Sequence, residues 1–172
     1  MKKLLALIVL CSAIGITTPL PAQTTTLGQP SQEEFSRLRG ISAFYIDVAS
    51  QDGATQDADL RNELRDLIEL ELRRANLSIR PLPVVGDTEN LTPMLRLNLK
   101  FDRGMGRFAC DMQLEVRDQV EITRNRKTIV ATTFQMDRSV SSPSDIFLRR
   151  DVKARTREMV NELISGLKKA NG

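Results

Sequence analysis

The chain of 172 residues contains no histidine and no tryptophan, and its aromatic residues are six phenylalanines and one tyrosine. Without histidine, the chain has no Ser-His-Asp or Cys-His catalytic unit and no histidine-ligated zinc site. Two cysteines are too few for a structural thiolate site. We therefore expect a protein that is not an enzyme and that uses no cofactor or metal.

The acidic residues do not supply a catalytic or metal site either. Asp111, Glu115 and Glu121 share one parity of a predicted strand, where charged residues on a solvent-facing side need no further explanation. The aspartates within residues 52–59 lack the spacing of an EF-hand loop, and they suit a polar loop and the start of a helix. Neither set predicts an active site.

The first 22 residues have the pattern of a secretory signal peptide. Two lysines precede an apolar run at residues 4–16, and Ala22 ends a segment suited to cleavage. The alternative is a lipid anchor on Cys11, but Leu10 stands where lipoprotein signals carry a small residue. We expect a periplasmic or secreted protein that is cleaved near Ala22, without a lipid on Cys11 and without a transmembrane segment in the mature chain.

Cleavage changes both the charge and the cysteine content. It removes two of the 25 basic residues and none of the 22 acidic ones, which leaves 23 basic residues against 22 acidic residues. A nearly neutral chain lacks the electrostatic signature of a nucleic-acid-binding protein. Cys110 then has no intramolecular partner, and its place on an apolar parity predicts a buried, inert thiol.

The mature chain divides into a leader and one domain. Residues 23–37 are rich in Thr, Gln and Pro, which predicts a flexible leader, and residues 38–170 form the domain. Within the domain, residues 40–50 predict a strand covered on both faces. Residues 60–75 repeat apolar side chains at steps of three and four, which is typical of an amphipathic helix. Two prolines confine residues 78–85 to a sheet edge or a non-strand segment.

The next segment predicts an antiparallel meander. Apolar and polar residues alternate through residues 95–102, 107–123 and 128–140, so each strand has one buried and one solvated face. Asn125 is expected to adopt a positive φ in the last turn.

A second helix closes the chain. Ser142 is the predicted N-cap, with Asp145 as the acidic member of a capping box, and the helix ends near Gly172. The resulting order β-α-β-β-β-β-α predicts an α+β fold, a two-layer sandwich with a mainly antiparallel sheet and two helices on one face.

Basic residues form the candidate interaction surface. Its members are Arg149, Lys153, Arg157, Arg150, Arg103 and Arg107. The first three are four residues apart and share one stripe of the closing helix, while the last two flank a glycine-containing hairpin. Such clusters bind anionic lipid headgroups or an acidic patch of a partner. The alternative is a solvated helix face that shares its charges with Asp151 and Glu158.

Several runs of sequence carry a resemblance to known proteins. They are FYIDV, LRNELRDLIELELRRANLSI, MLRLNLKF, VEITRN, ATTFQM and LRRDVKARTREMVNELISGL. Over residues 38–168 this pattern resembles a family of small exported bacterial proteins with no assigned activity, from which the chain departs by Asn76 in place of a glycine and Phe134 in place of a tryptophan. The element order is more distantly similar to the outer-membrane lipoprotein that plugs the lipopolysaccharide translocon and to auxiliary lipoproteins of lipid transport. The resemblance implies a fold and export, and no chemical role.

Together these observations indicate a non-catalytic, exported accessory or binding protein of the bacterial cell envelope. Its expected partner is an envelope protein or assembly, bound through a sheet edge or a helix face. The alternative is a carrier of a lipid or small apolar ligand, which requires a cavity between the helices and the sheet.

Overall fold

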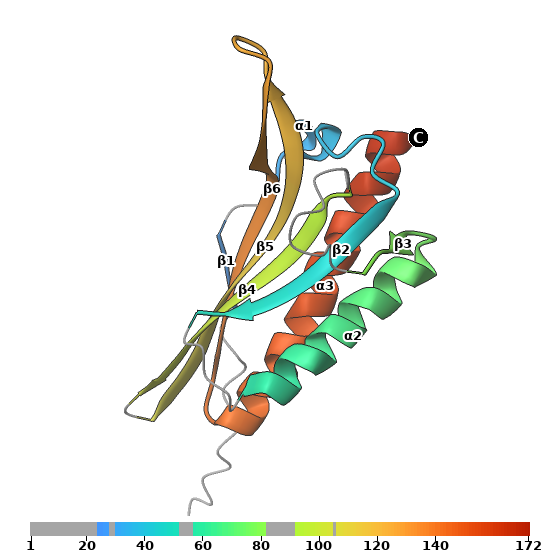
Figure 1. Ribbon diagram of the computed structural model, residues 1–172. Helices are drawn as coiled ribbons and strands as arrows, with labels where there is room; N and C mark the ends of the chain where they lie inside the picture. Colours follow the sequence, from blue (N-terminus) through green and yellow to red (C-terminus); the bar gives the residue numbers. More distant parts are fainter. Residues whose placement is uncertain (1–23, 28–29, 52–56, 82–91, 105) are drawn as a thin grey trace, which may run out of the picture.

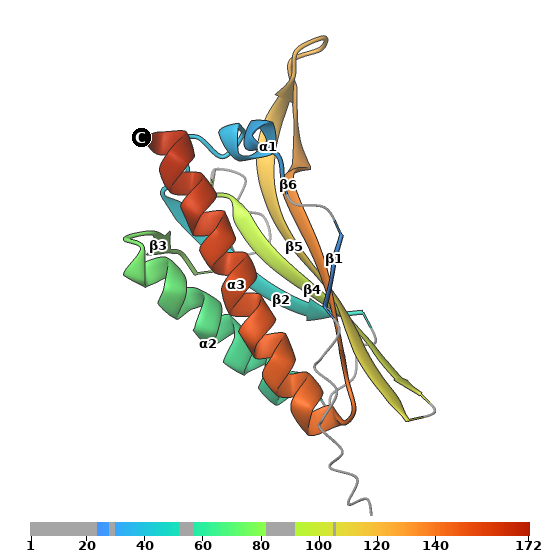
Figure 2. The same ribbon diagram turned by 180° about the vertical axis from the view of Figure 1, so that it is seen from behind.

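A computed structural model describes residues 24–27, 30–51, 57–81, 92–104 and 106–172, so the predicted signal peptide and Cys11 lie outside the described residues. The elements are β1 (Thr24–Leu27), α1 (Gln32–Ser36), β2 (Ala43–Ser50), α2 (Ala58–Arg74), β3 (Ser78–Ile79), β4 (Met94–Gly104), β5 (Arg107–Ile122), β6 (Lys127–Ser142) and α3 (Asp145–Asn171). The strands form one sheet in the order β1-β6-β5-β4-β2-β3. The helices lie on one face of it (Figures 1 and 2).

The α+β class and the element order from β2 to α3 are confirmed, but the sheet is mixed rather than mainly antiparallel. β4, β5 and β6 form the expected antiparallel meander, and β1 is antiparallel to β6. β2, however, is parallel to both β3 and β4. The reason is that α2 carries the chain back along the sheet after β2, so the next strands start from the same end as β2.

The core lies between the sheet and the two long helices. Every second residue of β4 and β5 is buried. α2 and α3 lie side by side on one face of the sheet (Figure 2), with α2 against β2 and β3 and α3 against β5 and β6. The completely buried side chains include Leu60, Leu64, Ile68 and Leu72 of α2, Leu95, Leu97 and Leu99 of β4, and Leu148, Val152 and Leu163 of α3. Leu70, which breaks the helical periodicity of α2, is exposed. In the described part of the chain, no helix is long and apolar enough to cross a membrane.

Two elements lie within residues 23–37, the segment for which the sequence predicts a flexible leader. β1 pairs with residues 137–140 of β6, and Ser31 begins α1 with a capping box. Phe35 is the apolar anchor of α1, and its ring centroid lies 5.1 Å from that of Phe134. Such short elements have too few apolar residues to show a periodicity. The spacing of Ser31 and Glu34 is a local signal for the start of α1, whereas β1 is defined by its pairing with β6.

The predicted turn and cap residues are partly corrected. Asn76 ends α2 with φ of 63°, as its amide side chain favours. In the β5–β6 turn the positive φ belongs to Arg126, not Asn125, whose Oδ1 instead accepts a hydrogen bond from the Lys127 amide at 3.1 Å.

α3 starts two residues later than its sequence predicts. Its N-cap is Ser144, whose side chain accepts a hydrogen bond from the Phe147 amide. Ser142 instead ends β6, and its hydroxyl donates to Asp151 at 2.5 Å. The strand extends this far because residues 141 and 142 pair with Ala109 and Phe108 of β5.

Candidate interaction site

The predicted basic stripe of α3 faces acidic side chains of the neighbouring helix. Its three ion pairs are Arg149 with Asp57 at 3.4 Å, Lys153 with Glu63 at 2.5 Å and Arg157 with Glu71 at 3.2 Å. Each acidic partner belongs to α2 or is its N-cap residue. The stripe therefore lies along the seam between the two helices, where its charge is neutralised.

The other predicted basic residues are scattered. Arg150 pairs with Asp151 at 3.1 Å, and its guanidinium lies 4.9 Å from the ring centroid of the exposed Phe147. Arg107 is exposed at the β4–β5 hairpin, opposite Gly104. The structure does not gather these residues and the stripe into one basic surface.

Arg103 belongs to a cluster of four charges at the end of β4. Its Nη1 and Nη2 donate to the two carboxylate oxygens of Asp57 at 2.9 and 2.7 Å, and its Nε donates to Asp145 at 2.9 Å. Arg149 donates to Asp145 at 3.0 Å, which closes the cluster. The guanidinium of Arg103 also lies 4.3 Å from the ring centroid of Phe101.

This cluster joins the starts of α2 and α3 to β4. Asp57 is completely buried and makes no side-chain hydrogen bond to the first turn of α2, so the ion pair replaces its expected capping role. The hydrogen bond with Asp57 raises the pKa of Arg103. Burial by itself would raise the pKa of Asp145, but hydrogen bonds from Arg149 and Arg103 outweigh it and lower that pKa. The cluster thus acts as a structural tie.

A different feature stands out from the fold: the outer end of the β5–β6 hairpin. β4 accompanies β5 only as far as the pair Met94 and Arg117, whereas β5 and β6 remain paired to Ile122 and Lys127. We call residues 118–131 the arm. It projects past the helices, at the top of Figure 1. The sequence contains a signal for it, because the alternation of β5 is several residues longer than that of β4.

A β-bulge at the base of the arm sets which side chains face outward. The register shifts after Val116, so that Thr133 is an extra residue of β6, and its hydroxyl donates to the Val116 carbonyl at 3.3 Å. Beyond the bulge, Ile129 shares the helix-side face with its partner Val120, and Val130 turns to the opposite face. Ile129 is 43% exposed and Val130 is 67% exposed.

The backbone edge of β6 is open along the arm. β1 pairs only with residues 137–140, so in the described part of the chain no strand lies beside residues 127–136 of β6. Residues 128–134 on this edge read TIVATTF and carry no charge. Among the described residues, no strand pairs with β5 beyond β4 either, but this edge carries Asp118 and Glu121.

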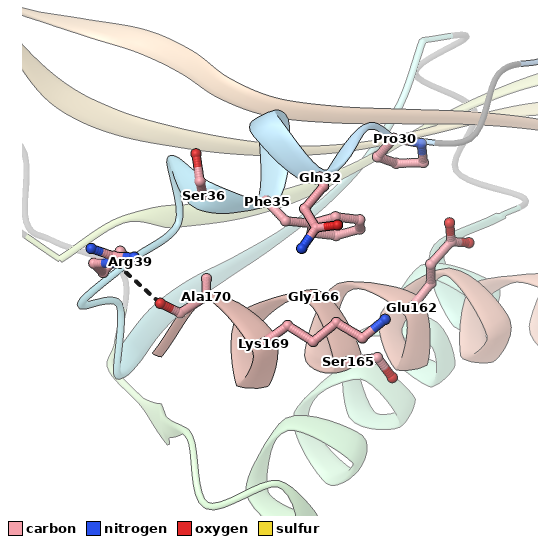
Figure 3. Close-up of a pocket in the computed structure, with 10 residues that line it drawn as sticks. All are labelled: Pro30, Gln32, Phe35, Ser36, Arg39, Glu162, Ser165, Gly166, Lys169 and Ala170. Carbon is pink, nitrogen blue, oxygen red and sulfur yellow. Dashed lines mark hydrogen bonds between the residues drawn. The ribbon is translucent and has the colours of Figure 1, made fainter. Parts of the chain in front are cut away.

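A surface pocket of about 410 Å³ lies between α1 and the last turns of α3 (Figure 3). Its lining includes Gln32, Glu162, Ser165 and Lys169, so it is polar and of mixed charge. Phe35 packs on Gly166 at its floor, where a Cβ atom would lie 1.9 Å from the ring, and Arg39 Nε donates to the Ala170 carbonyl at 3.1 Å. These contacts attach α1 to α3.

Two other residues that the sequence offers for chemistry, Cys110 and Glu115 of β5, have structural roles. Cys110 is completely buried, and burial raises the pKa of its thiol to about 12. Glu115 accepts hydrogen bonds from Asn98 and Thr132 on the sheet face opposite the helices. Among the described residues, no group of three or more His, Cys, Asp or Glu side chains is placed to hold a metal ion.

Comparisons with known proteins give distant structural likenesses only. No family model matches the sequence, and no curated protein matches it significantly. The PelC dodecamer from Paraburkholderia phytofirmans is 12% identical with a TM-score of 0.44, covering 83% of this chain and 95% of its own. An uncharacterised protein is 11% identical with a TM-score of 0.39, covering 74% and 92%. A predicted lipoprotein from Caulobacter crescentus CB15 is 15% identical with a TM-score of 0.32, covering 82% and 97%. At these values the likenesses carry no argument about function.

Proposed function

We propose that this protein is a non-catalytic accessory protein of the bacterial cell envelope and that it binds a protein partner through the arm. The observation that carries the proposal is the open edge of β6, with Ile129 and Val130 exposed outside the core. An exposed strand edge offers its backbone N–H and C=O groups to an added strand, and neighbouring apolar side chains add contact area.

The location in the envelope depends on the N-terminal sequence. Residues 1–22 have the n-region, apolar run and cleavage site of a signal peptide, and we infer export to the periplasm with cleavage near Ala22. Intact-mass measurement of the exported protein tests this part. A mature chain beginning near Gln23 supports it, and a lipid-modified N-terminal Cys11 contradicts it.

The arm explains binding better than the basic stripe does. Arg149, Lys153 and Arg157 already have carboxylate partners on the neighbouring helix, so an anionic partner would have to compete with them. The pocket of Figure 3 does not support the carrier alternative, because it lies between two helices rather than between the helices and the sheet.

Site-specific photo-crosslinking in exporting cells tests the role of the arm. A photoreactive amino acid replaces Val130, and in a matched control it replaces Asn62, which is exposed on α2. We expect a discrete protein adduct from position 130 and none from position 62, with mass spectrometry identifying the adduct. No protein adduct at position 130, or an equal one at both positions, would overturn the proposal.

A further inference from the structure

We infer that the partner of the arm is a second copy of this chain, with β6 pairing antiparallel to β6 about a two-fold axis. This inference rests on the proposed function, since it names the occupant of the same open edge. Pairing of this kind would join the sheets of the two copies into one continuous sheet.

The composition of the open edge is the first argument. Residues 128–134 contain five β-branched residues and one phenylalanine, with no charge, proline or glycine. Such segments have a high tendency to pair as strands, and natural proteins usually guard them on an open edge with charges or proline. On β5, the arm carries such charges at Asp118 and Glu121, whereas on β6 the only charge before Asp137 is Lys127 beside the turn, and residues 128–134 have none.

The charges that flank the neutral segment are the second argument. Arg124, Arg126 and Lys127 lie in or beside the turn at one end, and Asp137 lies beyond the other end. The Asp137 carboxylate accepts hydrogen bonds from the neutral amides of Gln113 and Gln135, and the next residue, Arg138, is buried and pairs with Glu162. When two copies pair antiparallel, the basic turn of each copy approaches the acidic end of the other. A parallel alignment would bring basic turn against basic turn. A two-fold interface requires a surface that complements itself, and this charge order meets that requirement.

The side chains fit the same arrangement. With the axis near Val130, the two copies of this exposed residue become cross-strand neighbours on one face. On the other face, Ile129 of each copy would lie beside Ala131 of the other and extend the apolar pair that Ile129 forms with Val120. The projection of the arm past the helices leaves this edge accessible (Figure 1).

Disulfide trapping tests the geometry. The purified chain carries Val130→Cys together with Cys11→Ser, and Cys110 does not interfere because it is completely buried. The control is Thr123→Cys, an exposed residue of the turn. At about 3.3 Å per strand residue, its two copies would be roughly 20 Å or more apart in the proposed pairing. Because pairing gives adjacent thiols a high effective concentration, we expect about tenfold faster dimer formation from position 130 than from position 123.

Sedimentation of the chain without cysteine substitutions gives an independent readout. We expect a concentration-dependent dimer for the natural residues and a monomer for Val130→Lys, because a lysine on the edge opposes strand addition. The matched control is Gln119→Lys, on the same face of the arm but on β5, which should remain dimeric. At a concentration low enough for the natural chain to be monomeric, both variants should retain its thermal unfolding midpoint, since both sites are outside the core.

The outcomes separate this inference from the proposed function. A monomer at all concentrations, or equal trapping rates at positions 130 and 123, overturns self-pairing. If position 130 then photo-crosslinks to a different protein, the arm is still a binding element and only the identity of its partner is wrong. If position 130 yields neither product, both the inference and the proposed function fail.

Discussion

Arg103 and Asp57 are 46 residues apart in the chain, and they meet through two hydrogen bonds of 2.9 and 2.7 Å on a completely buried carboxylate. The planar guanidinium matches the two carboxylate oxygens, which makes this a strong type of ion pair. Arg103, which the sequence places in a candidate interaction surface, is thereby a link between β4 and the start of α2.

Arg103→Met is expected to lower the free energy of unfolding by about 3 kcal/mol, because it leaves the Asp57 carboxylate buried without its main partner. Urea denaturation measures the loss. Arg107→Met, at the exposed end of the same hairpin, is the control and should change stability by less than about 0.5 kcal/mol. Equal midpoints for the two variants would show that the pair does not contribute to stability.

Gly166→Ala is expected to destabilise the protein, although alanine favours a helix interior over glycine by about 1 kcal/mol. The reason is the Phe35 ring, which would lie 1.9 Å from the added Cβ (Figure 3). In a Phe35→Ala background the clash is absent, and the same substitution should become stabilising. A thermodynamic cycle over the four proteins measures this change of sign, and an unchanged effect of Gly166→Ala in both backgrounds would contradict the contact.

The double variant Lys153→Gln and Arg157→Gln tests the basic stripe. Both cations are more than a third exposed, so their pairs with Glu63 and Glu71 should contribute at most about 1 kcal/mol each. Because both charges are already neutralised, we expect the double variant to co-sediment with anionic vesicles at low salt to the same extent as the unsubstituted chain. Neutral vesicles serve as the control for binding that does not depend on charge. A salt-sensitive loss of vesicle binding would instead establish the stripe as a lipid-binding surface.

The Cys110 thiol should be unreactive toward a disulfide reagent at pH 8 in the native protein and reactive in urea. Its pKa is raised from 9.0 to about 12, chiefly by burial. A raised folded-state pKa stabilises the protein fully below the unfolded-state value, and this contribution is lost as the pH rises from 9.0 toward 12. Cys110→Ala should therefore show a weaker fall of stability across that interval. Rapid native labelling at pH 8 would contradict the burial of the thiol.

The sequence by itself determined the regular elements of the domain. The alternation in β4, β5 and β6 and the helical spacing in α2 and α3 predict these elements, because each pattern records which side of a local element is buried. The cap at Asn76 follows equally from local chemistry, since an asparagine tolerates a positive φ. For the candidate site, the same reasoning places Arg149, Lys153 and Arg157 on one face of α3.

Only the tertiary structure decided what lies opposite those faces. The acidic partners of the stripe lie on α2 or at its N-cap. Asp57 is 92 residues from Arg149 and Glu71 is 86 residues from Arg157, and no local pattern specifies partners so far away. The structure of residues 24–27 and 32–36 depends on contacts with β6 and Gly166. Whether a strand edge is open is also non-local, because it depends on where neighbouring strands stop. The last residue of β5 that pairs with β4 is Arg117, and β1 pairs only with residues 137–140 of β6. Within the described residues the edges of the arm are therefore open, which the sequence of the arm itself could not establish.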